Sequence, residues 1–85
     1  MSKVALITGA NRGIGFVTAK ALGALGMHLI IGSRDSAKGE AAVKALQALG
    51  YQAEAVAYDA NDQNHPSAIY QYIDKHHGKL DILVN

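Results

Sequence analysis

The feature that most constrains the fold is the glycine-rich stretch Thr8–Gly15, which follows the apolar run Val4–Ile7 and opens onto an amphipathic segment. Glycines let the backbone turn tightly and let a ligand come close to the main chain. The first turn of a following helix directs unpaired N–H groups and a partial positive charge at that ligand. A strand that turns through glycines into a helix therefore predicts a phosphate-binding loop.

The rest of the chain repeats the alternation of strand and helix. We expect strands over residues 3–8, 27–31, 52–58 and 80–84, separated by helices that end at Gly26, Gly50 and Gly78. This alternation predicts an α/β fold with a parallel sheet and right-handed crossovers. In the doubly wound arrangement, four strands in the order 3-2-1-4 and three helices place the ligand crevice at the carboxyl ends of strands 1 and 4.

Apolar residues at helical spacing predict which helix faces pack against the sheet. In chain order they are Ile14, Val17, Ala21, Leu22 and Leu25, then Ala42, Val43, Leu46 and Leu49, then Ile69, Tyr70 and Ile73. Ser36 is the expected N-cap of the second helix. The first two helices should share one face of the sheet, and only the third should cover the other. The under-covered face and the unpaired apolar edge of the last strand predict an oligomer.

Composition excludes several classes of protein. The formal net charge of the 85 residues is +1 with scattered basic residues, which gives no field to attract nucleic acid or an anionic membrane. There is no cysteine, so disulfides and thiolate metal sites are excluded. No apolar run approaches membrane length and no signal peptide is recognisable, so we expect a cytoplasmic protein.

The histidines are not expected to bind a metal. His76 and His77 are adjacent, so their side chains point about 100° apart on a helix, and no carboxylate recurs at ligand spacing. We expect both to stabilise the end of their helix. His28 is interpreted as a core or edge residue of its strand, and Tyr70 and Tyr72 as partly buried packing residues.

The glycine loop departs from two familiar phosphate-binding patterns. A P-loop needs a lysine after its last glycine, whereas Phe16 follows Gly15. The common dinucleotide fingerprint is Gly-x-Gly-x-x-Gly, whereas this loop reads Gly9-x3-Gly13-x-Gly15. With Thr8 before it, the loop resembles that of the short-chain dehydrogenase/reductase family, which binds NAD or NADP on a Rossmann fold.

The resemblance extends along the chain to Ser33–Arg34, Asp59 and Leu80–Asn85, where Asn85 is similar to the first residue of the family's Asn-Asn-Ala-Gly motif. The stretch Asn11–Gly15 is most similar to the carbonyl-reductase-like branch. The resemblance implies that residues 1–85 are the N-terminal part of a single NAD(P)-binding Rossmann domain, a fragment of a longer protein.

The loop after the second strand distinguishes the two cofactors. An NAD site needs a carboxylate there for the ribose hydroxyls, whereas an NADP site needs a guanidinium for the 2′-phosphate. Alignment to the family puts Ser33 at the acidic position, with Arg34 beside it and Arg12 in the glycine loop. This pattern favours NADP. Two alternatives stay open: Asp35 would face the ribose if the strand ended later, and Arg34 could be a solvated loop charge.

The resemblance implies a set of residues at the cofactor: Gly9, Asn11, Arg12, Gly13, Ile14, Gly15, Ser33, Arg34, Asp59 and Asn85. In the family, the residue at Asp59 accepts a hydrogen bond from the adenine amino group, although a turn cap is an alternative. Asn11 is expected near the adenosine ribose or the backbone of its own loop.

Catalytic residues of the family are absent from this sequence. Family members transfer hydride between the nicotinamide and a carbonyl or alcohol carbon, using a serine and a tyrosine followed four residues later by a lysine. The residues four positions after the four tyrosines are Ala55, Asp62, Asp74 and His76. We therefore interpret the chain as the cofactor-binding part of an NADP-dependent oxidoreductase acting on a small carbonyl substrate. The alternative is a stand-alone, non-catalytic nucleotide-binding module.

Overall fold

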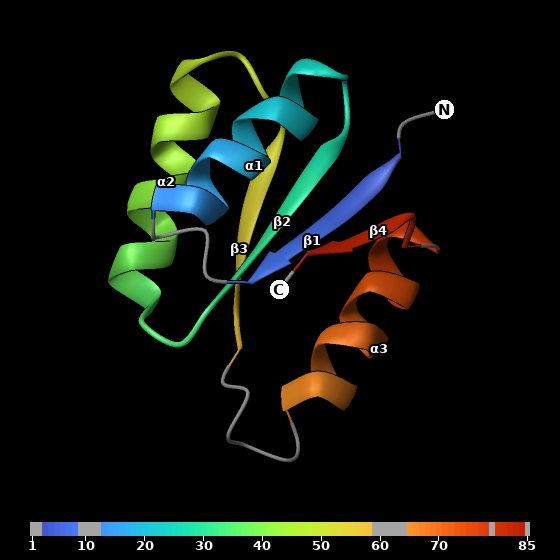
Figure 1. The fold of residues 1–85 in the computed structure, drawn as a ribbon. Coiled ribbons are helices and arrows are strands. Elements are labelled where there is room, and N and C mark those ends of the chain that lie inside the picture. The colour runs from blue at the N-terminus through green and yellow to red at the C-terminus, as the bar shows by residue number, and fades with distance from the viewer. Residues whose placement is uncertain (1–2, 9–12, 59–64, 79, 85) are drawn as a thin grey trace.

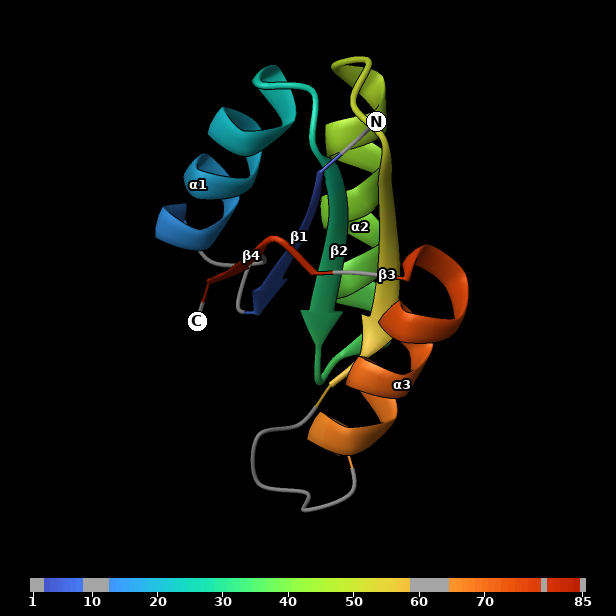
Figure 2. The ribbon, with the colours of Figure 1, turned by 90° about the vertical axis from the view of Figure 1, so that its right-hand side faces the viewer.

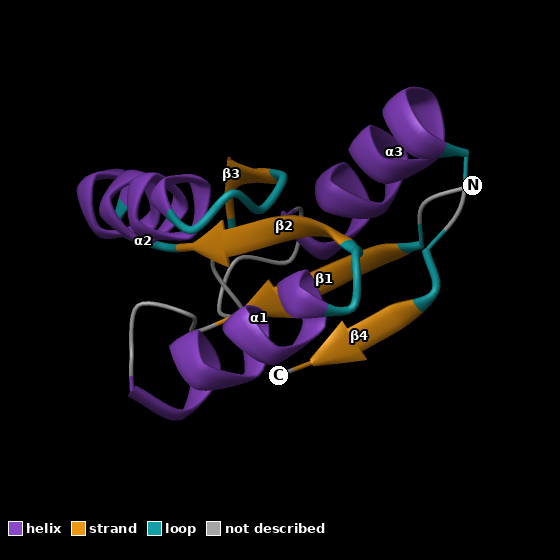
Figure 3. Cartoon of the chain, turned by 90° about the horizontal axis from the view of Figure 1, so that it is seen from above, coloured by secondary structure: helices purple, strands orange, loops and turns teal. Residues whose placement is uncertain are grey.

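The computed structural model describes residues 3–8, 13–58, 65–78 and 80–84. Its elements alternate in chain order: β1 (Val4–Thr8), α1 (Gly13–Ala24), β2 (His28–Ser33), α2 (Ser36–Ala48), β3 (Ala53–Ala57), α3 (His65–His77) and β4 (Ile82–Val84). The strands form one parallel sheet in the order β3-β2-β1-β4 (Figures 1 and 3). The predicted fold class and strand order are confirmed.

The two sides of the sheet carry separate hydrophobic clusters. Because side chains alternate along a strand, Ala5, Ile7, Leu29 and Ile31 face α1 and α2, and Val4, Leu6 and Ile30 face α3. The three helices cover the two faces unequally, as predicted, with α3 alone on its side (Figure 2). Each fully buried Leu or Ile side chain contributes about 1.5–3 kcal/mol of hydrophobic free energy.

Glycines end the helices where the sequence predicts. Gly26, Gly50 and Gly78 have φ angles of 87°, 89° and 74°, a left-handed conformation that costs glycine little. After α2, the backbone amide of Tyr51 donates to the carbonyl of Leu46 (3.2 Å), which closes the turn into β3. None of the helices in the described ranges is long and apolar enough to cross a membrane.

Two strand boundaries differ from the prediction by two residues, and the others by at most one. β2 continues past Ile31 because Gly32 and Ser33 pair with β3. β4 begins at Ile82 rather than Leu80. The carboxylate of Asp81 accepts the amide hydrogen of Val4 (2.7 Å) while its own amide donates to the Val4 carbonyl (2.9 Å), so a side chain holds the register where the strand begins.

The predicted packing face of α1 is wrong in part, although Leu22 packs against the core as expected. Val17 and Leu25 are exposed (64% and 75%), whereas Ala19 is fully buried and Gly23 is buried. A Cβ added to Gly23 would lie 2.7 Å from the ring of Tyr51, so α1 approaches the core through its small residues. The helix carries apolar residues on more than one side, and Phe16, Ala19 and Leu22 are the ones that pack against the core. Leu49 and Tyr70 were also expected inside and are about half exposed.

Candidate cofactor site

The structure describes part of the predicted cofactor site. Gly9, Asn11, Arg12, Asp59 and Asn85 lie outside the described residues. The described members are Gly13, Gly15, Ser33, Arg34 and the helical backbone of Ile14. They lie at the carboxyl ends of β1 and β2, where Thr8 pairs with Gly32. The start of α1 and the loop after β2 therefore belong to the same end of the sheet.

Gly13 is the first residue of α1, and its surroundings are open. A Cβ added to Gly13 would meet no described atom within 4 Å, unlike the crowded Gly23 on the same helix. Packing among the described residues therefore gives no reason for glycine at this position. The first amide groups of a helix have no partner within it, so the open space beside Gly13 suits an anion that hydrogen-bonds to the backbone.

Ser33 is the last residue of β2, and its side chain is directed into the fold. It is 6% exposed, and its hydroxyl donates to the Asp35 carbonyl oxygen (2.8 Å). Gly39 of α2 packs closely on it, since a Cβ at Gly39 would lie 3.0 Å from the Ser33 Cβ. A direct contact of the Ser33 hydroxyl with cofactor stays a prediction. The observed role of Ser33 is to shape the turn that carries Arg34.

Asp35, and not Ser36 as predicted, caps α2. Its backbone is extended (φ −99°, ψ 111°), and its Oδ1 accepts hydrogen bonds from the amides of Ala37 (2.9 Å) and Lys38 (3.2 Å). The N-cap is therefore one residue earlier than expected, and only Arg34 lies between the end of β2 and this cap. The Asp35 carboxylate is therefore occupied by its own helix, which argues against the alternative that it binds the ribose.

Arg34 is exposed between Ser33 and the capping Asp35. Within the part of the chain that the structure describes, no acidic side chain forms an ion pair with its guanidinium. An unpaired guanidinium at the carboxyl end of β2 can bind a phosphate with two hydrogen bonds.

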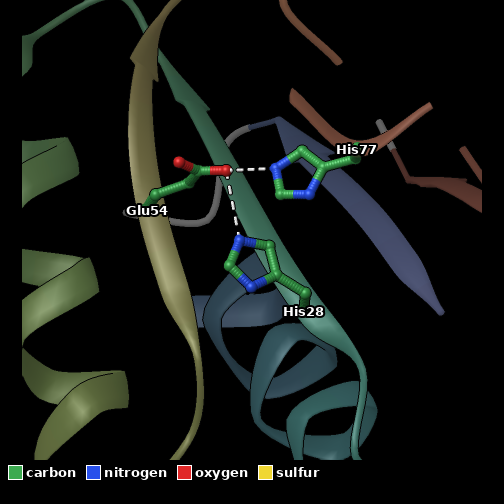
Figure 4. A group of neighbouring side chains, drawn as sticks. All are labelled: His28, Glu54 and His77. Carbon is green, nitrogen blue, oxygen red and sulfur yellow. Dashed lines mark hydrogen bonds and ion pairs between the residues drawn. The ribbon is translucent and has the colours of Figure 1, made fainter. Parts of the chain in front are cut away.

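A second polar cluster lies at the opposite end of the sheet and was not predicted. Glu54 Oε1 contacts His77 Nε2 at 2.6 Å and His28 Nε2 at 3.1 Å (Figure 4). The Tyr72 hydroxyl donates to the other carboxylate oxygen, Glu54 Oε2, at 2.6 Å. His77 was expected only to stabilise the end of α3, and it bonds to β3 as well. Sequence reasoning missed the cluster because Glu54 is separated from His28 by 26 residues and from His77 by 23.

The contacts in this cluster shift two pKa values. Partial burial raises the pKa of Glu54, but hydrogen bonds from Tyr72, His77 and His28 outweigh it, so the pKa falls below its ordinary value of 4.5. The hydrogen bond from Tyr72 to this carboxylate, with burial and the negative charge, raises the tyrosine pKa to about 12. The cluster therefore favours a charged glutamate beside a protonated tyrosine.

Comparison with known proteins identifies relatives across the whole chain. Carbonyl reductase (NADPH) 1 of Bos taurus is 41% identical over 96% of this chain. A solved metagenomic short-chain oxidoreductase in complex with NADP superposes with a TM-score of 0.90 at 36% identity, over 98% of this chain and 38% of its own. A short-chain dehydrogenase/reductase from Burkholderia phymatum in complex with NAD gives 0.88 at 30% identity, over 96% of this chain and 29% of its own.

The chain spans about a third of the length of the curated relatives it matches, 30% in the case of the bovine reductase. The family model of the short chain dehydrogenases matches residues 3–85. This match covers nearly all of the sequence. The chain belongs to the short-chain dehydrogenase/reductase family.

Proposed function

We propose that this chain forms the NADP-binding part of an oxidoreductase that transfers hydride between NADP(H) and a carbonyl or alcohol substrate. The observation that carries the cofactor assignment is the turn after β2. There Arg34 is exposed without a described acidic partner, while the neighbouring carboxylate of Asp35 is bound to the first amides of α2. A 2′-phosphate at this turn could bind the Arg34 guanidinium. The nearby Asp35 carboxylate is already hydrogen-bonded to the amides of Ala37 and Lys38.

The described residues fit a dinucleotide. The start of α1 offers open space at Gly13 for the pyrophosphate, and Arg34 lies at the end of the adjacent strand for the adenosine phosphate. Bound NADP would supply the hydride chemistry. Within the proposal, this chain's residues bind and orient the adenosine and pyrophosphate groups, and no residue of the chain is assigned a catalytic role. The cytoplasmic location and the small carbonyl substrate remain parts of the proposal.

Relatives support NADP without being unanimous. The bovine reductase is named for NADPH and the metagenomic oxidoreductase was solved with NADP, whereas the Burkholderia phymatum relative carries NAD. Family membership alone therefore leaves the choice between the two cofactors to the turn after β2. That turn holds Arg34 and no unoccupied carboxylate among the described residues.

Isothermal titration calorimetry of the protein with NADP⁺ and with NAD⁺ tests the proposal. Arg34→Ala should weaken NADP⁺ binding by about 1–3 kcal/mol, the loss of a charge-assisted contact, and leave NAD⁺ binding nearly unchanged. Lys44→Ala is the matched control, since it removes an exposed cation from the middle of α2. Equal losses for both cofactors would contradict the assignment of Arg34 to the 2′-phosphate, and no binding of either would contradict the proposed function.

We also propose that β4 pairs with a second copy of the chain. The strand forms one edge of the sheet, and its Leu83 is 46% exposed. An edge strand with unpaired backbone groups and apolar side chains is a template for a further strand.

A further inference from the structure

We propose that His28, Glu54 and His77 form a binding site for a divalent transition metal, with Zn²⁺ the best fit. The three side chains converge from β2, β3 and the end of α3 (Figure 4). One ligand atom from each, two imidazole nitrogens and one carboxylate oxygen, lies within 4.8 Å of the other two. Two histidines and one carboxylate are a ligand set that Zn²⁺ takes in proteins, with the fourth position left to water.

The spacing of the ligand atoms is close to what a metal requires. Tetrahedral Zn²⁺ holds nitrogen and oxygen ligands at roughly 2.0–2.2 Å, which separates two ligand atoms by about 3.3 Å. Without a metal, Glu54 Oε1 lies 3.1 Å from His28 Nε2 and 2.6 Å from His77 Nε2. All three ligand atoms lie within 4.8 Å of one another, so small side-chain movements would arrange them around one ion.

Metal binding would replace the hydrogen bonds in this cluster. Each Nε2 that contacts Glu54 must offer its lone pair to the metal, so in the metal-bound state each imidazole carries its proton on Nδ1. Charge favours metal binding, because the Glu54 carboxylate gains a divalent cation. The remaining carboxylate oxygen, Oε2, keeps its hydrogen bond from the Tyr72 hydroxyl (2.6 Å).

Tyr72 acts as a positioning residue in this arrangement. By binding Oε2 it turns Oε1 towards the two imidazoles, the role that outer hydrogen bonds play at metal sites. The ligand side chains are shielded but reachable, with exposures of 21% for His28, 18% for His77 and 29% for Glu54. A cation can therefore enter from solvent and still be partly desolvated when bound.

The site is separate from the proposed cofactor site. His28 is the first residue of β2 and Glu54 the second residue of β3, so the cluster lies at the amino ends of the parallel strands. The glycine loop and Arg34 lie at the carboxyl ends. A metal here would tie α3 to two strands, so the proposal assigns it a role in stability, whichever cofactor the other end binds.

The test is a titration of metal-depleted protein with ZnCl₂, followed by calorimetry and thermal unfolding. We expect one Zn²⁺ per chain and a rise in the unfolding midpoint of about 10–20 °C at a hundredfold excess over the dissociation constant. His77→Gln and His28→Gln should each weaken binding at least tenfold, and Tyr72→Phe about tenfold. His76→Gln is the matched control, since His76 is adjacent to His77 in α3 and lies outside the group of three proposed ligands.

Two results would overturn the proposal. One is Zn²⁺ binding that survives His28→Gln but is lost in His76→Gln, since that would assign it to the adjacent histidine pair. The other is wild-type protein with no rise in its unfolding midpoint. Because a variant could lose Zn²⁺ by unfolding, circular dichroism of each metal-free variant is recorded first. Co²⁺ loaded into wild-type protein gives an independent readout, with the intense visible absorption of tetrahedral Co²⁺ expected and the weak absorption of octahedral Co²⁺ contradicting the geometry.

Discussion

Asp35 caps α2 by accepting the backbone amide of Ala37 on its Oδ1 at 2.9 Å, and this contact links the end of β2 to the helix that follows. Because the same carboxylate oxygen also accepts the amide of Lys38, two of the unpaired donors at the helix start are satisfied. The contact decides both where α2 begins and which charged side chain of the turn remains available to a ligand.

The first prediction concerns this cap. Asp35→Ala should lower the free energy of unfolding by about 1 kcal/mol, because two helix amides lose their acceptor. Asp35→Asn keeps an acceptor oxygen and is the control, with a much smaller loss expected. Urea denaturation followed by circular dichroism measures both. If Asp35→Ala selectively weakened NAD⁺ binding, the carboxylate would contact the ribose of the cofactor, contrary to its hydrogen bonds to the first amides of α2.

The second prediction is a loss of stability in alkali through Tyr72. The pKa of Tyr72 in the folded protein is raised from 10.0 to about 12, so its protonated form stabilises the fold fully below pH 10. Between pH 10 and about 12 the unfolded chain loses this proton first, and the contribution disappears. In metal-free protein, the stability difference between wild type and Tyr72→Phe should therefore be about 1 kcal/mol at neutral pH and shrink across that range.

Tyr70→Phe provides the control for this measurement, because Tyr70 lies on the same helix with its side chain 46% exposed. Its stability should track the wild type at every pH. A difference between wild type and Tyr72→Phe that stays constant to pH 12 would show that the hydrogen bond to Glu54 does not govern the titration.

The third prediction compares two glycines of α1. Gly23→Ala places a methyl group 2.7 Å from the Tyr51 ring and should cost about 1–3 kcal/mol of stability, more than the 0.5–1 kcal/mol that alanine gains in a helix. Gly13→Ala meets no described atom, so its stability should be unchanged or slightly higher, while NADP⁺ binding should fall about tenfold. Measuring both the unfolding and the NADP⁺ affinity of the two variants separates an effect on packing from an effect on cofactor binding. Unchanged NADP⁺ binding in Gly13→Ala would contradict the proposed site.

Local signals in the sequence were sufficient for most of the fold. The glycines that end the three helices depend on neighbouring residues alone, and the structure confirms them. The packing face of α1 was not predictable in this way. Val17 and Leu25 follow a helical repeat, yet the helix packs through Ala19 and Gly23 because small residues allow the closest approach to the sheet.

The two polar sites also differ in how far the sequence predicts them. The position of Arg34 after β2 follows from the order of elements, whereas the contact of Glu54 with His28 and His77 depends on how β2, β3 and α3 pack. No spacing along the chain signals that contact. Glu54 comes close to His28 because β3 pairs with β2 in the register that places Ala53 beside Leu29. The sequence does not give this register, so the contact could not be predicted from it.

The fourth prediction tests association through β4. Leu83→Lys places a charge on the edge strand, where charged side chains oppose strand addition, and should shift the protein from dimer to monomer in sedimentation velocity. Leu49→Lys is the matched control, since Leu49 is similarly exposed (50%) but caps α2, which packs on β2 and β3. Its sedimentation should equal that of the wild type. A wild-type protein that sediments as a monomer at every concentration, or a dimer that persists in Leu83→Lys and dissociates in Leu49→Lys, would contradict pairing through β4.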